Sequence, residues 1–268
     1  WERLRREDRE EAPSVTLTVR DSAGEVVRRL DGPAAKGFHR VAWNMRYPAP
    51  DPVRLEAAAD RSPWEDDPAG PLVLPGRYTV SLAKRVEGRY QEIAEPQTVV
   101  LKPMFSGGLV TDDRAGLLEF QQKSAELHRA VLGADRAAGE IENRIDHLLK
   151  AVAETPAAGE PQAGALRALR ARMQDLRVQL NGDSTVTSRN EPAPLAIRGR
   201  VARIVSGSWG SQAEAGGTFR DSYAVAARQF PPLLDELRSV ADELAVIEQA
   251  LEAEGAPWTP SRIPDWRP

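Results

Sequence analysis

Two hydrophobic periods divide this chain into an N-terminal and a C-terminal part. In the first part apolar and polar residues alternate, as Val15, Leu17 and Val19 do with the residues between them. This period of two is typical of strands with one buried face. Turn signals occur at Gly24 and Gly88. The expected strands are residues 15–21, 26–30, 38–45, 77–85 and 97–103. These short strands predict an immunoglobulin-like antiparallel β-sandwich.

Trp43 and Tyr78 stand at fixed points in this strand pattern. We expect Val41, Trp43 and Met45 to face the interior, with Trp43 as the core tryptophan of the sandwich. Tyr78 directly follows the turn sequence of residues 75–77. We expect its ring to pack while its hydroxyl reaches a backbone group. Both aromatic residues are therefore interpreted as structural.

The second part of the chain has the period of amphipathic helices. Apolar and small residues step by three and four along one long seam, which predicts a single long helix. The seam consists of Leu117, Phe120, Ser124, Leu127, Val131, Ala134, Ala138, Ile141, Ile145, Leu148 and Val152. Thr111 is expected to open this helix, with Asp112 and Asp113 in its first turn.

Three further helices are expected after a break at residues 155–161. Their apolar positions are Leu166, Leu169, Met173, Leu176 and Leu180; Ile197, Val201 and Ile204; and Phe230, Leu233, Leu237, Val240, Leu244, Ile247 and Leu251. The second helix is predicted to end at Asn181-Gly182, and Pro231-Pro232 is predicted to break or kink the fourth. Four such segments favour an antiparallel four-helix bundle.

The predicted fold class is α+β and multidomain: an immunoglobulin-like antiparallel β-sandwich followed by an antiparallel four-helix bundle. The expected parts are a charged lead-in over residues 1–13, the sandwich over 14–104 with a loop insertion at 48–71, the helical bundle over 109–256 and a Pro/Trp tail over 257–268. Because the chain begins at Trp1 with a charged segment, we expect an upstream region to have been removed.

Composition excludes several classes of function. The chain of 268 residues has 36 Lys and Arg against 40 Asp and Glu, whereas a nucleic-acid binder needs a basic face. It contains no cysteine, so disulfides, thiolate metal sites and cysteine nucleophiles are impossible. No apolar run approaches the roughly 20 residues of a membrane span. We therefore expect no nucleic-acid partner and no membrane span.

The sequence shows no catalytic constellation. His128 and His147 lie nineteen residues apart on one predicted helix, roughly 28 Å at 1.5 Å per residue. They cannot share a metal within a subunit, and His39 stands alone on a predicted strand. Neither a G-x-S-x-G elbow nor a phosphate-binding loop occurs. The Gly-rich segments at Trp209 and Gly216 are interpreted as flexible connectors. We expect no catalytic residue, no cofactor and no metal.

One acidic loop offers a contact surface. It contains Trp64, Glu65, Asp66 and Asp67, and its simplest interpretation is a solvated loop. Alternatively Trp64 stacks on a sugar, or two acids that include Glu56 converge as a glycosidase pair.

The tail offers a second contact surface through Trp258 and Trp266. Either the tail folds back along the bundle or sandwich and buries both rings, or they dock a neighbouring domain or chain.

Two sequences carry a family resemblance: VTLTVRDSAGEVVRRLDGPAAKGFHRVAWNMRYPAP and GPLVLPGRYTVSL. They resemble the C-terminal region of large bacterial proteins built on sortilin-type or Asp-box (BNR) β-propellers, which are often labelled glycosyl hydrolase-like. The β part is also similar to the immunoglobulin-like domain of flagellar hook-capping proteins. The helical segment and the Pro/Trp ending agree with the same propeller-associated region.

This resemblance implies an exported parent, secreted or periplasmic, with a propeller upstream of the chain. No Asp-box repeat occurs in the 268 residues, so the propeller and any hydrolase active site are expected elsewhere in the parent. The leading hypothesis is a non-catalytic C-terminal accessory module that packs on the propeller or mediates protein interaction. The alternatives are a carbohydrate-binding module with a glycan partner, or part of a glycoside hydrolase-like protein whose active site lies in the propeller.

Overall fold

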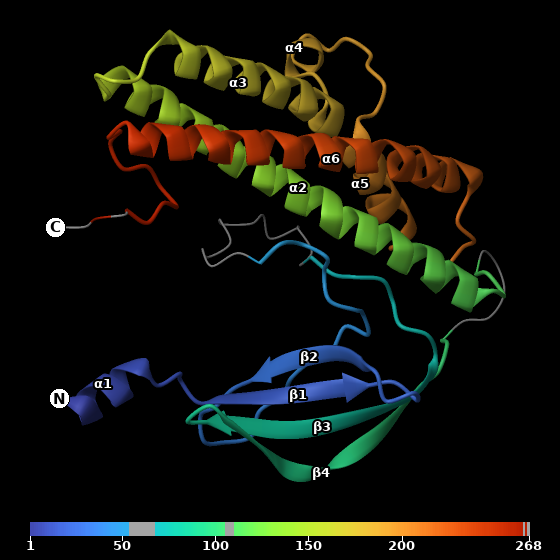
Figure 1. The fold of residues 1–268 in the computed structure, drawn as a ribbon. Coiled ribbons are helices and arrows are strands. Elements are labelled where there is room, and N and C mark those ends of the chain that lie inside the picture. Colours follow the sequence, from blue (N-terminus) through green and yellow to red (C-terminus); the bar gives the residue numbers. More distant parts are fainter. Residues whose placement is uncertain (54–67, 105–109, 265, 267–268) are drawn as a thin grey trace. The chain divides into compact units, whose positions relative to one another are not determined.

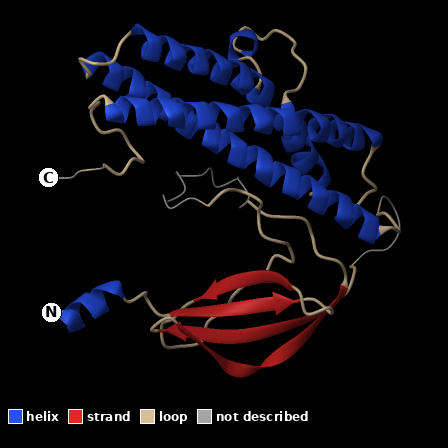
Figure 2. Cartoon of the chain, in the orientation of Figure 1, coloured by secondary structure: helices blue, strands red, loops and turns tan. Residues whose placement is uncertain are grey.

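The computed structural model describes residues 1–53, 68–104, 110–264 and 266, and the fold is α+β. Contacts group the chain into two compact units. The first consists of Trp1–Pro50, Ala58–Gln122 and Trp209–Glu214, and the second of Asp51–Ala57, Lys123–Ser208 and Ala215–Pro268. The first unit contains the strands and the second most of the helices (Figures 1 and 2). Each has its own hydrophobic cluster.

The first unit is built on a four-stranded antiparallel sheet with the strand order β2-β1-β3-β4. The strands are β1 (Ser14–Arg20), β2 (Val26–Gly32), β3 (Gly76–Val86) and β4 (Arg89–Leu101). The two predicted turns are confirmed: Gly24 and Gly88 lie between paired strands with φ of +84° and +71°. Glycine adopts this left-handed region without steric cost, so it fixes where the chain reverses.

The two faces of the sheet differ in polarity, as the alternating pattern predicts. Val19 pairs with Val80 on one face, and the neighbouring pair of Thr18 and Ser81 lies on the other. The buried cluster consists of Val19, Val27, Val73 and Tyr78. An antiparallel sheet with one apolar face buries that face and leaves the other to solvent.

Residues 38–45 form a loop, so the predicted third strand is wrong. Met45 has φ of +57°, outside the extended region, and its side chain is exposed. Trp43 nevertheless reaches the cluster and packs edge-to-face on Tyr78, with ring centroids 5.5 Å apart. Its Nε1 donates to the carbonyl of Arg46. The ring of Trp43 anchors this loop. The predicted inward-facing row of Val41, Trp43 and Met45 does not form.

A short paired segment follows the loop. Residues 45–47 pair with residues 70–73 through three backbone hydrogen bonds of 2.9–3.0 Å. The pairing brings the chain so close together that a Cβ on Gly70 would lie 2.5 Å from the carbonyl oxygen of Pro48. Glycine is therefore required there for steric reasons, and the pairing places Val73 against the sheet.

Six helices occur in the described residues. They are α1 (Glu2–Arg9), α2 (Arg114–Glu154), α3 (Glu160–Asn181), α4 (Ser184–Thr187), α5 (Ile197–Ser208) and α6 (Gly217–Ala253). The predicted lead-in thus contains a helix, α1, that buries no residue. None of the described helices is both long and apolar enough to cross a membrane.

The helices α2, α3, α5 and α6 share one hydrophobic cluster. The predicted seam is confirmed along α2, where Val131, Ile141 and Ile145 are buried. The seam residues of α3 and α5 are buried as well, and those of α6 are buried except for the partly buried Ile247. Burial of a continuous apolar stripe from each helix supplies the main stabilisation of this unit.

The predicted end of α3 is confirmed, the predicted start of α2 is wrong, and the predicted break in α6 does not occur. Gly182 ends α3 with φ of +92°, and its N–H donates to the carbonyl of Val178, as predicted. However, Asp113 precedes α2 and caps it by accepting the Gly116 N–H at 2.9 Å. Pro231-Pro232 lies inside α6 and does not break it. Tertiary packing of the stripe on α6 outweighs the backbone hydrogen bonds that two prolines remove.

Candidate functional site

A pocket of about 410 Å³ lies within the first unit. Its walls come from the segment before β3, the end of β4, the first turns of α2 and the segment after α5. Most of the lining is aliphatic or thioether; its apolar side chains are Met45, Leu72, Val73, Leu74, Pro75, Leu101, Pro103, Met104, Val110, Leu117 and Leu118. The volume falls within the range of about 300–1,000 Å³ that is usual for small-molecule sites.

Two hydrogen bonds hold the wall made by residues 209–214. The Nη1 of Arg46 donates to the carbonyl of Trp209 at 3.1 Å, and also to the carbonyl of Gly70 at 3.1 Å. The N–H of Thr111 donates to the carbonyl of Gln212 at 2.9 Å. These bonds tie the segment to the pairing near Gly70 and to the residues that precede α2.

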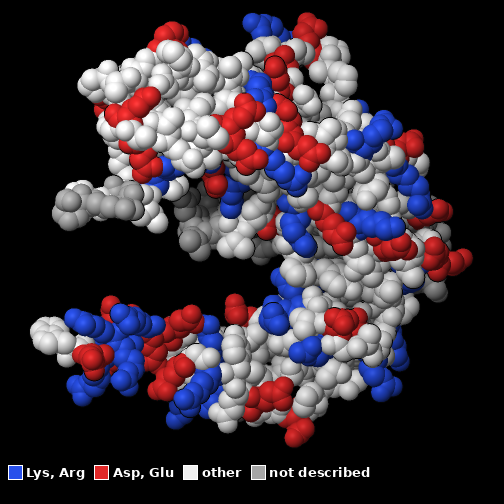
Figure 3. Space-filling view, in the orientation of Figure 1, with Lys and Arg blue, Asp and Glu red and all other residues white. Residues whose placement is uncertain are grey.

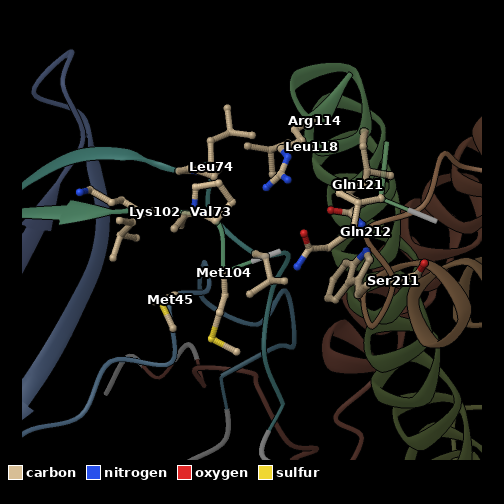
Figure 4. Close-up of a pocket in the computed structure, with 17 residues that line it drawn as sticks. Met45, Val73, Leu74, Lys102, Met104, Arg114, Leu118, Gln121, Ser211 and Gln212 are labelled. Carbon is tan, nitrogen blue, oxygen red and sulfur yellow. The ribbon is translucent and has the colours of Figure 1, made fainter. Parts of the chain in front are cut away.

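The polar groups of the pocket are few, and each of them is cationic or neutral. They belong to Lys102, Arg114, Gln121, Trp209, Ser211 and Gln212, and the described lining has no carboxylate, histidine or cysteine. Figure 4 shows the side chains of Arg114 and Gln212 directed toward the space between Leu118 and Val73, and the ammonium of Lys102 pointing away from Arg114. The pocket is therefore apolar with a polar side at the start of α2.

Trp209 contributes a buried donor to this wall. The residue is only 6 % exposed, and among the described residues its Nε1 has no hydrogen-bond acceptor. A buried donor without a partner costs about 1–3 kcal/mol. The indole of Trp209 is thus an unsatisfied donor in the interior of the first unit.

Tyr78 anchors the sheet next to the pocket, and its predicted role is confirmed. Its ring is buried, and its hydroxyl donates to the carbonyl of Leu74, a pocket residue, at 2.7 Å. Burial raises the pKa of Tyr78 to about 12, with smaller contributions from Tyr47 and Asp21. Burial also raises the pKa of Tyr47. Both phenols are therefore neutral hydrogen-bonding groups at ordinary pH, which suits structural residues.

The three histidines do not form a site together. A ring nitrogen of His39 lies 2.7 Å from the carbonyl of Ala35, and one of His147 lies 2.7 Å from that of Asn143. Burial lowers the pKa of His128, whose Nδ1 has no partner among the described residues. No cluster of three potential metal ligands occurs in the described part of the chain.

Charged side chains of the second unit pair with one another across helices. Arg144 of α2 forms a bidentate bond with Glu248 of α6, with N–O distances of 2.9 and 2.7 Å. Glu248 is 5 % exposed and also lies 3.5 Å from Arg262 of the tail. Arg172 of α3 likewise bonds Glu243 at 2.8 Å. On the visible face, acidic and basic residues are interspersed (Figure 3), which is typical of a structural surface.

The contact residues predicted from the sequence are not brought together by the described structure. Trp64, Glu65, Asp66 and Asp67 lie outside the described residues, as does Glu56.

The two tail tryptophans are exposed, so the expected burial of their rings is wrong. Trp258 is 63 % and Trp266 78 % exposed. The tail does fold back: Arg262 pairs with Glu248, and the indole Nε1 of Trp258 donates to the carbonyl of Arg262. Trp258 lines a pocket of about 190 Å³ in the second unit. The Arg262 ion pair and the hydrogen bond of the Trp258 indole hold the tail in place without burial of the rings.

Sequence reasoning missed the pocket residues. Trp209 was expected in a flexible connector, although a tryptophan among Gly and Ser residues is itself a signal of burial. The alternating pattern predicts Met45 in the core and indicates no role for Met104. Their shared role depends on segments that are distant in sequence, so no local pattern could have joined them.

Comparisons with protein-family models, with curated proteins and with solved structures find no match to this chain. The propeller-associated resemblance noted in the sequence therefore stays a prediction.

Proposed function

We propose that this chain is a non-catalytic accessory module that acts by binding. In the context that the resemblance implies, it packs on an upstream β-propeller of an exported parent or mediates the interaction of that parent with a protein partner. The finer fold that accompanies this proposal is an immunoglobulin-like sandwich followed by an antiparallel four-helix bundle.

The observation that carries the proposal is the chemistry of the pocket of about 410 Å³. Hydrolysis by acid–base or nucleophilic catalysis needs a carboxylate pair, or a nucleophile beside a base. Ser211 is the only hydroxyl among the described lining residues, and no histidine or carboxylate accompanies it there. An apolar cavity with a few polar groups is suited to binding.

The distribution of charge supports the same proposal. The nearly buried Glu248 is paired with Arg144 of α2 and Arg262 of the tail, so its carboxylate oxygens are engaged in contacts within the chain. Arg177 is similarly engaged by Asp135 and Glu142. These charges connect helices of the second unit, which is a structural use of them.

The first test is an assay of the purified chain against panels of glycans and peptides. We expect no turnover above a buffer control. Turnover that scales with protein concentration and co-purifies with the chain would refute a non-catalytic module.

The second test concerns context. We expect the full reading frame of the parent to encode a β-propeller before Trp1, and the separately produced propeller to bind this chain in calorimetry. A reading frame without a propeller would refute the accessory role that the resemblance implies.

A further inference from the structure

We propose that the pocket of the first unit binds a small apolar monocarboxylate, with the carboxylate on the Arg114 side and the hydrocarbon body toward Val73 and Met104. The inference adds a ligand to the proposed non-catalytic function and rests on it, since the ligand is bound and not converted.

The apolar lining determines the body of the ligand. Eleven of the seventeen described lining residues are aliphatic, proline or methionine. Met45 and Met104 are both partly or largely exposed, and their flexible thioethers can adapt to hydrocarbon chains of different shape. Transfer of hydrocarbon from water onto this surface is favourable in proportion to the area buried.

The charges determine the head group. Both ionised groups among the described lining residues, Lys102 and Arg114, are cationic. Arg114 already interacts within the chain, but a guanidinium has five N–H donors and can share them with a ligand. Its planar fork matches a carboxylate, and such charge-assisted pairs strengthen where water is excluded. A cationic head group would be repelled.

Trp209 adds an aromatic ring to the apolar part of the lining. The residue lines the pocket and is more than nine-tenths buried, and its Nε1 is covered by protein atoms. The carboxylate of the ligand is therefore assigned to the Arg114 side alone.

The test is isothermal titration calorimetry with three probes of equal chain length: decanoate, decanol and decyltrimethylammonium, each below its micellar concentration. We expect decanoate to bind with one-to-one stoichiometry and at least tenfold more tightly than decanol. Decyltrimethylammonium is expected to bind more weakly than decanol. Equal binding of the three probes would overturn the inference.

Variants locate the site. Arg114→Gln is expected to bind decanoate no more tightly than decanol, whereas Arg129→Gln, an exposed arginine of the same helix, leaves the preference unchanged. Met104 is 85 % exposed, so Met104→Asp should fold normally. It is expected to abolish decanoate binding and to favour decyltrimethylammonium. Undiminished decanoate binding by both Arg114→Gln and Met104→Asp would overturn the inference.

Recovery of the ligand separates the two proposals. Mass spectrometry after incubation is expected to return decanoate unchanged. Chemical conversion of decanoate would refute the non-catalytic function, whereas absence of binding would refute only the ligand assignment.

Discussion

At the residue scale, Tyr78 shows how one side chain can join a sheet to its surroundings. Its ring packs against Trp43, and its hydroxyl bonds the carbonyl of Leu74, four residues earlier. The ring fills the small cluster above the sheet, while the hydroxyl fixes the segment that enters β3. A turn followed by tyrosine was enough to predict this local role. The carbonyl of Leu74 lies four residues away in sequence, and Trp43 belongs to the loop that packs against the same cluster.

Substitution of Tyr78 by phenylalanine tests this role. The variant keeps the ring but loses one hydrogen bond, so we expect its free energy of unfolding at pH 8 to fall by about 1 kcal/mol. The pKa of Tyr78 is raised in the folded state from 10.0 to about 12, so its stabilising contribution is complete below pH 10 and is lost between about pH 10 and pH 12. The deficit of the variant should therefore shrink over that range in denaturant titrations.

The matched control is Tyr90→Phe, because Tyr90 is 68 % exposed. Its stability should equal that of the wild type at pH 8. A Tyr78→Phe deficit that grows between pH 10 and pH 12 would contradict the assignment.

The pair of Arg144 and Glu248 provides a second prediction at this scale. Glu248→Ala leaves a half-buried guanidinium without its bidentate partner, and loss of one member of a buried pair costs about 3 kcal/mol. We expect a decrease of that order in the free energy of unfolding, measured by urea titration. Asp235→Ala, which removes an exposed pair with Arg238 on the same helix, should cost less than about 1 kcal/mol.

At the scale of elements, local periodicity predicted the four helices that share the large cluster, α2, α3, α5 and α6, but not the short helices α1 and α4; it also predicted the four strands of the sheet. The seam on α2 could be followed residue by residue, since each turn of a helix repeats the same burial. Residues 38–45 show where this reasoning fails. Their alternation is that of a strand, yet no described neighbouring strand pairs with them beyond the contacts of residues 45–47. A strand needs a partner for its backbone groups, and alternation alone does not supply one.

The prolines of α6 give a prediction at the scale of elements. Pro231 and Pro232 are exposed and lie inside a continuous helix, where each removes a backbone donor. Replacement by alanine opens no cavity and restores a hydrogen bond. We therefore expect Pro232→Ala to raise the free energy of unfolding by about 1–3 kcal/mol. Thermal melts of Pro232→Ala and Pro231→Ala measure this, and a lower melting temperature in both would contradict it.

At the scale of the whole molecule, the chain has two compact units with separate hydrophobic clusters. The cluster of the first unit is small and centres on Tyr78, while that of the second extends along four helices. A unit with its own core can unfold cooperatively by itself.

This organisation predicts two unfolding transitions. We expect Tyr78→Phe to shift only one of them and Glu248→Ala only the other, when unfolding is followed by calorimetry. Both variants shifting a single common transition would show that the chain unfolds as one cooperative body.

The sequence by itself determined the helical stripes, the turns at Gly24 and Gly88 and the hydrogen bond of the Tyr78 hydroxyl to the backbone, because each depends on residues a few positions apart. Tertiary structure alone decided the pocket. Its walls join residues 45, 72–75, 101–104 and 110–121 to residues 209–212, and no periodicity relates positions so distant. The burial of Trp209 also depends on distant residues. The segment that contains it forms part of the pocket wall because Arg46 and Thr111 donate hydrogen bonds to its backbone carbonyls. Local repeats specify elements, whereas a site requires that particular elements meet.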